Sequence, residues 1–232
     1  MFLDHLIKKV FEQFRQKLTP QIIAKQLRQP KGKLGVIISN KMNESNRALY
    51  EFTIHAMQIQ DSQSILEIGF GNGLFFNSLF SSAKNLRISG IDFSADMVKL
   101  ATRNNEDLIQ ASSLDLQFGD CEILPFESNT FDKVFCINVV YFWDNPSDNL
   151  SEIHRVLKPG GLFYTSIRDE ETMQQMEFTK FGFNLIRVDQ WSNLLVKNRF
   201  STELTHTFIE PTLEANGMHL KPKSHCIAAK KI

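Results

Sequence analysis

The feature that most constrains the fold is a short apolar segment that runs directly into a glycine-rich turn. Residues 64–69 (SILEIG) have the composition of a buried strand, and glycine recurs at Gly69, Gly71 and Gly73. Glycine is needed where a backbone bends sharply or approaches a ligand closely. In open α/β sheets, ligands bind beyond the carboxyl ends of the strands, where such turns lie. The segment therefore predicts an α/β fold with a ligand at this turn.

Strands and helices alternate after the turn. The further predicted strands are residues 86–92, 114–118, 131–138 and 162–167. The amphipathic segments predicted as helices are residues 71–82, 94–107 and 147–157. This alternation indicates a mainly parallel sheet with helices on both faces. The tail differs, because residues 170–181 and 189–197 are predicted helices while 202–209 and 225–229 are predicted strands.

The first 60 residues are predicted to be helical. An amphipathic helix covers residues 2–18, and a second runs from 20 to about 27 before the break at 29–32. A third helix is expected to start at Asn43 or Ser45 and to reach residue 58. Asn40, Met42, Asn43 and Asn46 form a polar cluster before this helix that can close over a ligand, and we expect at least one of the asparagines to be a helix cap instead. We expect residues 1–60 to be a helical extension and 61–232 to be the ligand-binding domain.

Composition excludes several classes of protein. The 26 basic and 26 acidic residues balance, so no nucleic-acid partner is expected. Three widely spaced cysteines, Cys121, Cys136 and Cys226, form neither a disulfide framework nor a zinc pattern, so no metal site is expected. The sequence lacks a run of transmembrane length and the start lacks a secretory leader, so we expect a cytoplasmic protein. Contact of helix 2–18 with a membrane surface stays open as an alternative.

The residues around the turn favour a nucleoside ligand without a pyrophosphate. A dinucleotide fingerprint would place glycine at position 74, where this chain has Leu74, and no Lys or Arg lies near the turn to meet phosphate. Asp92 ends the next predicted strand, where a carboxylate can accept both ribose hydroxyls, although NAD would also satisfy it. After the third strand, Asp120 can accept an adenine amino group, and the backbone N–H of Cys121 can reach a ring nitrogen.

Four segments carry a resemblance to a known family: ILEIGFGNG (65–73), GIDFSADMV (90–98), GDCEILPFESNTFDKVFCINVVYFW (119–143) and EIHRVLKPGGLFYTSI (152–167). In order and spacing they resemble the class I S-adenosylmethionine (AdoMet)-dependent methyltransferases, most of all the branch with the ubiquinone and menaquinone biosynthesis methyltransferases. The resemblance implies a Rossmann-like α/β fold. Its seven-stranded mixed sheet has an antiparallel last strand, helices on both faces and, here, an N-terminal helical extension.

The resemblance also implies which residues bind AdoMet. They are Glu67, Gly69, Gly71, Asn72, Gly73, Asp92, Phe93, Met97, Asp120, Cys121 and Asn138. By the resemblance, the glycine turn lies against the methionine moiety, Glu67 lies near the methionyl ammonium group and Asn138 faces the methionyl end. Asp92 then holds the ribose, and the residues at 93, 97, 120 and 121 surround the adenine.

The function implied is methyl transfer from AdoMet to a small-molecule acceptor, which leaves S-adenosylhomocysteine. Relatives often carry a histidine after the fourth strand, where this chain has Tyr141-Phe142-Trp143, so no catalytic residue is assigned. Tyr141, His154, His206 and His55 are interpreted as packing or surface residues. Two alternatives remain: a regulator that binds AdoMet or S-adenosylhomocysteine without chemistry, and a nicotinamide-dependent oxidoreductase. The sequence does not indicate an oligomeric state.

Overall fold

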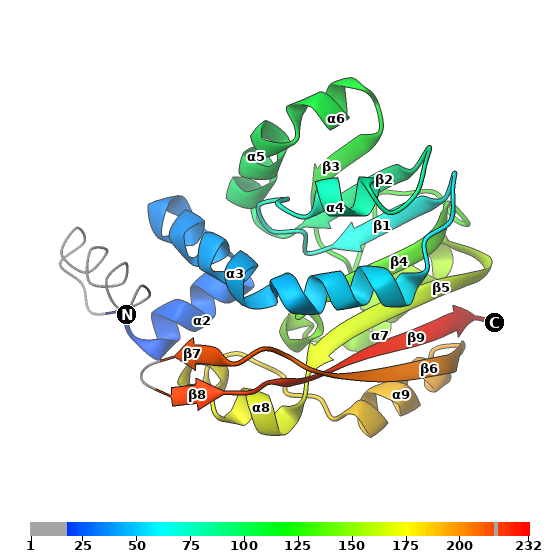
Figure 1. Ribbon diagram of the computed structural model, residues 1–232. Helices are drawn as coiled ribbons and strands as arrows, with labels where there is room; N and C mark the ends of the chain where they lie inside the picture. Colours follow the sequence, from blue (N-terminus) through cyan, green and yellow to red (C-terminus); the bar gives the residue numbers. More distant parts are fainter. Residues whose placement is uncertain (1–17, 216–217) are drawn as a thin grey trace.

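A seven-stranded mixed sheet forms the centre of the computed structural model, which describes residues 18–215 and 218–232 (Figure 1). The strands are β1 (Ser64–Ile68), β2 (Arg87–Asp92), β3 (Leu114–Phe118), β4 (Phe131–Ile137), β5 (Leu157–Arg168), β6 (Phe200–Ile209) and β9 (Lys223–Lys231). Their order is β3-β2-β1-β4-β5-β9-β6. Strands β1 to β5 are parallel, and β9 is antiparallel to both of its neighbours. The predicted fold class is confirmed.

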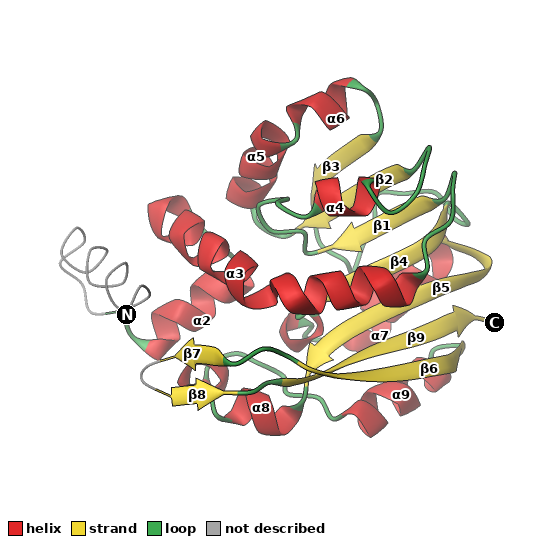
Figure 2. Ribbon diagram, in the orientation of Figure 1, coloured by secondary structure: helices red, strands yellow, loops and turns green. Residues whose placement is uncertain are grey.

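Helices cover both faces of the sheet (Figure 2). One face packs against α3 (Gly32–Met57), α4 (Phe76–Phe80), α5 (Ala95–Asn104) and α6 (Glu106–Gln110). The other packs against α7 (Pro146–Val156), α8 (Glu170–Gln174) and α9 (Val188–Lys197). Successive side chains of β1 point to opposite faces of the sheet. Ile65 packs on the side of α3 to α6, and Leu66 packs on the side of α7 to α9. A strand buried on both sides in this way reads as a continuous apolar run in the sequence.

The N-terminal helices begin and end partly as predicted. Helix α2 (Pro20–Arg28) is confirmed, and Thr19 caps it by accepting from the N–H of Ile22. The start expected at Asn43 or Ser45 is wrong, because α3 begins at Gly32 and both residues lie inside it. The N–H of Gly32 donates to Asp96 Oδ2 at 2.7 Å, so a contact distant in sequence holds the true start. The helix expected over residues 2–18 falls almost wholly outside the described residues.

Three other expected helices are interrupted. Residues 71–82 form a helix only over α4, because the glycine turn occupies the preceding residues. The helix at 94–107 breaks between α5 and α6 at Asn105, whose side chain donates to the carbonyls of Gly73 and Ala101. Residues 170–181 divide into α8 and the 3-10 helix η2 (Glu177–Lys180).

Three short elements were not predicted. Strands β7 (Leu213–Ala215) and β8 (Met218–Leu220) pair antiparallel after β6, and the 3-10 helix η1 (Val140–Phe142) follows β4. Elements of three residues have too few positions to carry a periodic pattern. The division of the chain at residue 60 stays a prediction. Within residues 18–215 and 218–232, no helix has the length and apolar character needed to cross a membrane.

A buried ion pair fastens the end of β5 to the segment after β6. Both Arg168 Nε and Nη2 donate to the Glu210 carboxylate at 2.8 Å, and each side chain is almost fully buried. The hydroxyl of Ser224 in β9 also donates to Glu210. Arg168 Nη2 lies 3.0 Å from the carbonyl oxygen of Ser45, so the same pair anchors α3.

We expect Glu210→Gln to lower the free energy of unfolding by about 3 kcal/mol, because removing one partner leaves a buried charge uncompensated. Urea unfolding measures the change. The matched control is Glu177→Gln, which removes an exposed pair with Lys180 and should cost less than about 0.5 kcal/mol. Equal effects of the two substitutions would contradict the structural role of the Arg168–Glu210 pair.

Candidate functional site

The predicted residues of the glycine turn, with Glu67, Asp92 and Asn138, gather where β1, β2 and β4 end. Strand β1 lies between β2 and β4 and is parallel to both, so their carboxyl ends share one edge of the sheet. Glu67 is in β1, Asp92 ends β2 and Asn138 follows β4. Helix α3 packs on the same face of the sheet as the glycine turn (Figure 1).

The turn after β1 needs glycine for different reasons at different positions. Gly69, Gly71 and Gly73 all have positive φ, at 76°, 58° and 69°. A Cβ on Gly69 would lie 2.4 Å from Val139 Cγ2, so the chain after β4 packs directly on the turn. A Cβ on Gly71 would meet nothing within 4 Å, so the turn faces open space there. Only glycine combines this backbone with so close a neighbour at position 69.

Asp92 is held beneath the turn by backbone groups. Its carboxylate accepts from the N–H of Gly71 and from the N–H of Ser94, each at 2.8 Å. The side chain is 8% exposed. Burial raises the pKa of Asp92 to about 6, although the two hydrogen bonds act in the opposite direction. The acid at the end of β2 is therefore fixed in place and poorly solvated.

Glu67 is a second buried acid beside the first. It is 5% exposed and accepts a hydrogen bond from the Tyr50 hydroxyl at 2.7 Å. Burial, and then the charge of Asp92, raise the pKa of Glu67 to about 8, while the Tyr50 hydrogen bond opposes them. In the described part of the chain, no Lys or Arg forms an ion pair with either carboxylate. Two buried acids without a basic partner suit a ligand that carries positive charge.

Asparagines of α3 reach the turn and the end of β4. Asn72, at the centre of the turn, donates to Asn40 Oδ1 at 2.9 Å and accepts from Asn43 Nδ2 at 2.8 Å. Asn138 donates to Asn46 Oδ1 at 3.2 Å. The expectation that at least one of these asparagines caps a helix is wrong, because all three lie within α3, and their side chains contact Asn72 and Asn138. The start of α3 at Gly32 explains the error.

The adenine-side residues are only partly brought together. The N–H of Gly119 donates to the carbonyl of Asp92 at 3.1 Å, which sets the chain after β3 beside β2. Phe93 is 44% exposed and Asp120 is exposed, whereas the side chains of Met97 and Cys121 are buried. Burial raises the pKa of the Cys121 thiol well above its ordinary value. The thiol of Cys121 and the thioether of Met97 thus lie beneath the surface.

The loop between α2 and α3 covers the start of α5. Gln29 Nε2 donates to the carbonyl of Phe93 at 2.9 Å, and the hydroxyl of Ser94 donates to the carbonyl of Pro30. Arg28 forms an ion pair with Asp144 at 2.7 Å. The N-terminal helices therefore extend along the same edge of the sheet as Asp92 and Asn138.

Sequence reasoning missed Tyr50 as a site residue. Its signal is a helical stripe, because positions 40, 43, 46 and 50 lie on one face of a helix. The stripe is visible only when the helix is started at Gly32. Tyr141 is also buried, with its hydroxyl 2.9 Å from the Arg168 carbonyl and 3.3 Å from Asn138 Oδ1, and burial raises its pKa.

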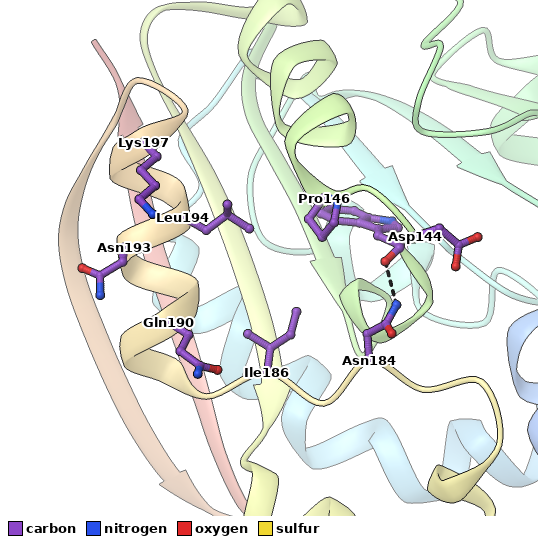
Figure 3. A pocket seen from close by; sticks show the side chains of 9 residues that line it. Asp144, Pro146, Asn184, Ile186, Gln190, Asn193, Leu194 and Lys197 are labelled. Carbon is purple, nitrogen blue, oxygen red and sulfur yellow. Dashed lines mark hydrogen bonds between the residues drawn. The ribbon is translucent and has the colours of Figure 1, made fainter.

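A groove of about 470 Å³ lies elsewhere on the molecule (Figure 3). Its lining side chains come from α9, from the residues just before α7 and its first residue, and from the segment between η2 and α9, and include Asp144, Asn184, Gln190 and Lys197. None of the predicted cofactor-binding residues lines it. Since α7 and α9 cover the sheet face opposite α3, this groove is separate from the glycine turn.

Comparisons with known proteins establish the family. A methyltransferase-domain family matches residues 66–165. An uncharacterized methyltransferase of Bacillus subtilis, YdaC, is 32% identical over 146 residues, which cover 62% of this chain and 78% of that protein. The ubiquinone/menaquinone biosynthesis C-methyltransferase UbiE of Geotalea daltonii is 28% identical over 117 residues, which cover half of each chain. The chain belongs to the class I AdoMet-dependent methyltransferases and resembles the UbiE branch.

A solved structure agrees on the fold. A chain in the complex between the Haloferax volcanii Trm112 methyltransferase activator and its putative methyltransferase superposes with a TM-score of 0.74 at 18% identity, over 83% of this chain and 92% of that one. From the family match and the relatives, the protein is an AdoMet-dependent methyltransferase, and AdoMet is its cofactor. The two unpaired buried carboxylates fit this cofactor, because its sulfonium and ammonium groups are both positively charged.

We expect Gly71→Ala to cost about 1 kcal/mol of stability, because only the strained backbone opposes it. Gly69→Ala should cost about 2–4 kcal/mol, since overlap with Val139 adds to the strain. Urea unfolding of both variants measures the difference. Val139→Ala in the Gly69→Ala background should recover part of the loss. Equal costs at the two positions would contradict the tight packing of the turn on Val139.

The buried Glu67 also predicts a pH dependence. With the pKa of Glu67 raised to about 8, the folded chain binds more protons than the unfolded chain between about pH 5 and 8. The free energy of unfolding should therefore fall as pH rises through this window. Glu67→Gln removes the titration and should flatten the profile, as measured by urea unfolding at several pH values. Identical slopes for the two proteins would show that Glu67 ionises normally.

Proposed function

We propose that this methyltransferase acts on a small-molecule acceptor and holds AdoMet against the glycine turn. The observation that carries the proposal is the pair of buried acids, Glu67 and Asp92, at neighbouring strand ends beside that turn and without a basic partner. A nucleoside with a cationic tail satisfies both acids, whereas the pyrophosphate of a dinucleotide would meet two like charges. The neutral net charge of the chain also favours a small acceptor over a nucleic acid.

Each predicted residue has a role in this proposal. Asp92 accepts the ribose hydroxyls, because two backbone N–H groups leave further lone pairs on its oxygens. Glu67 binds the methionyl ammonium group. The glycine turn with Asn72, and Asn138 across from it, enclose the methionine moiety. The remaining residues, on the adenine side, are Phe93, Met97, Asp120 and Cys121.

The main catalytic task of the protein is to orient the acceptor against the methyl group of AdoMet. AdoMet supplies a methyl group on a good leaving group, which an acceptor displaces in line. Holding two reactants in the right geometry contributes about 7–11 kcal/mol to such a reaction. We assign no general base, since Tyr141 is buried and hydrogen-bonded within the fold.

The N-terminal extension is proposed to close the site. Supporting contacts run from Gln29 to the carbonyl of Phe93, from Asn43 to Asn72 and from Asn46 to Asn138. A cover of this kind excludes water from the donor and strengthens the electrostatic contacts beneath it. We also infer a reducing compartment, because all three cysteines are free and buried.

The proposal is tested by incubating the full chain with AdoMet and a panel of quinols, phenols, amines and thiols. We expect S-adenosylhomocysteine release to rise above the acceptor-free rate with one of these classes. Binding of AdoMet by calorimetry without release for any class would favour a regulator that binds the cofactor and does no chemistry. Heat of binding with NAD in place of AdoMet would contradict the assignment of the turn.

Asp92→Ala should weaken the binding of AdoMet and S-adenosylhomocysteine more than tenfold, since the ribose loses its acceptor. Isothermal calorimetry measures both affinities. Asp115→Ala is the matched control, because Asp115 is an exposed acid on β3 that bonds only Gln117 in the described residues. Unchanged affinity in a folded Asp92→Ala variant would remove Asp92 from the proposed site.

A further inference from the structure

One face of α3 carries four polar side chains that all contact the proposed donor site. Asn40 and Asn43 meet Asn72, Asn46 meets Asn138, and Tyr50 meets Glu67. The three asparagine contacts join amides that are partly buried, whereas the Tyr50 contact joins a hydroxyl to an ionisable group in the interior. The Tyr50 contact is therefore the one that can set the chemical state of the site.

The Tyr50 ring is fixed by its neighbours. It stacks on Phe75, just past the glycine turn, with ring centroids 4.2 Å apart and an interplanar angle of 21°. It meets Phe135 of β4 edge-on at 6.0 Å. Tyr50 is 4% exposed, so its hydroxyl has no water to turn toward and its position follows from the packing of the ring. The 2.7 Å bond to Glu67 Oε2 is thus preformed.

The groups around Glu67 decide which residue donates in the Tyr50–Glu67 hydrogen bond and how the bond affects the ionisation of Glu67. The titratable groups that act on or near Glu67 are Tyr50 from α3, Asp92 from β2 and Cys136 from β4. Burial and Asp92 disfavour the carboxylate, and the Tyr50 hydrogen bond favours it. The pKa of Tyr50 is itself raised by burial, so the phenol stays protonated and donates to Glu67.

We propose that Tyr50 is a positioning residue for cofactor binding, and that its hydroxyl holds Glu67 in the orientation that binds the methionyl ammonium group and favours its ionisation there. This inference rests on the proposed role of Glu67. Binding of the ammonium group then breaks the O–H bond of a neutral Glu67 and releases its proton to solvent, and no bond between heavy atoms changes. Because Tyr50 belongs to α3, the ammonium site is complete only when α3 is seated on the sheet.

Tyr50→Phe tests the proposal, because it removes the hydroxyl and keeps the stacked ring. Calorimetry compares S-adenosylhomocysteine with 5′-methylthioadenosine, which has the same nucleoside but no amino-acid group. We expect Tyr50→Phe to weaken S-adenosylhomocysteine binding about fivefold or more at pH 7 and to change 5′-methylthioadenosine binding less than twofold. The pH at which S-adenosylhomocysteine affinity reaches half of its high-pH value should rise, because Glu67 ionises less readily without the hydrogen bond.

Two further variants make the result specific. Tyr164→Phe removes another buried tyrosine hydroxyl, one that reaches the Met57 carbonyl of α3 and not the site, and should leave both affinities within twofold of wild type. Glu67→Gln should abolish the pH dependence of S-adenosylhomocysteine binding above about pH 7, since Glu67 titrates near 8 and the remaining acid, Asp92, titrates near 6. In that background, Tyr50→Phe should cost less than a further twofold, because the two residues act through one contact.

Three outcomes would overturn the inference. The first is a Tyr50→Phe protein with wild-type affinity and pH profile. The second is an equal loss for both ligands, which indicates a structural role for the hydroxyl. The third is full additivity with Glu67→Gln. Failure of the proposed function is a separate result, since the wild-type chain would then bind neither S-adenosylhomocysteine nor 5′-methylthioadenosine.

Discussion

Two carboxylates buried side by side are the constraint around which the site is built. Glu67 and Asp92 come from adjacent parallel strands, in which Glu67 lies opposite Gly90 and Ile68 opposite Ile91. Parallel pairing therefore brings both acids to one edge, where burial makes their negative charge costly. Backbone N–H groups of Gly71 and Ser94 compensate Asp92 in part, and the Tyr50 hydroxyl compensates Glu67. A cofactor with a positive charge supplies the counter-charge that no Lys or Arg of the described residues gives these acids.

Helix α3 connects this site to the rest of the sheet. Arg168 donates to the Ser45 carbonyl, and the hydroxyls of Thr53 and Ser166 lie 2.6 Å apart in the interior. The helix is thus fastened at β5 by contacts that lie outside the donor site, while its asparagines and Tyr50 reach into it. The contacts with β5 fix the position of α3, and this position places its asparagines and Tyr50 beside the glycine turn and the site acids.

The sequence predicted most of the sheet, the glycine turn and the place of Asp92 at the end of β2, because these signals are local. Strand β3 was predicted to the residue, and the turn at Gly69 follows from glycine spacing. The contribution of α3 was not predictable in the same way. Its start at Gly32 depends on a bond to Asp96, 64 residues away, and Tyr50 became a site residue through burial against Phe135. Contacts between residues far apart in the chain produce no periodic pattern in the sequence from which they could be predicted.

The most direct test is a crystal structure of the full chain with S-adenosylhomocysteine. We expect ribose hydroxyls within hydrogen-bond distance of Asp92, the ammonium group on Glu67, and the Tyr50–Glu67 hydrogen bond retained. Ligand density confined to the groove beside α9, or a donor edge that accepts only a pyrophosphate-bearing coenzyme, would contradict it.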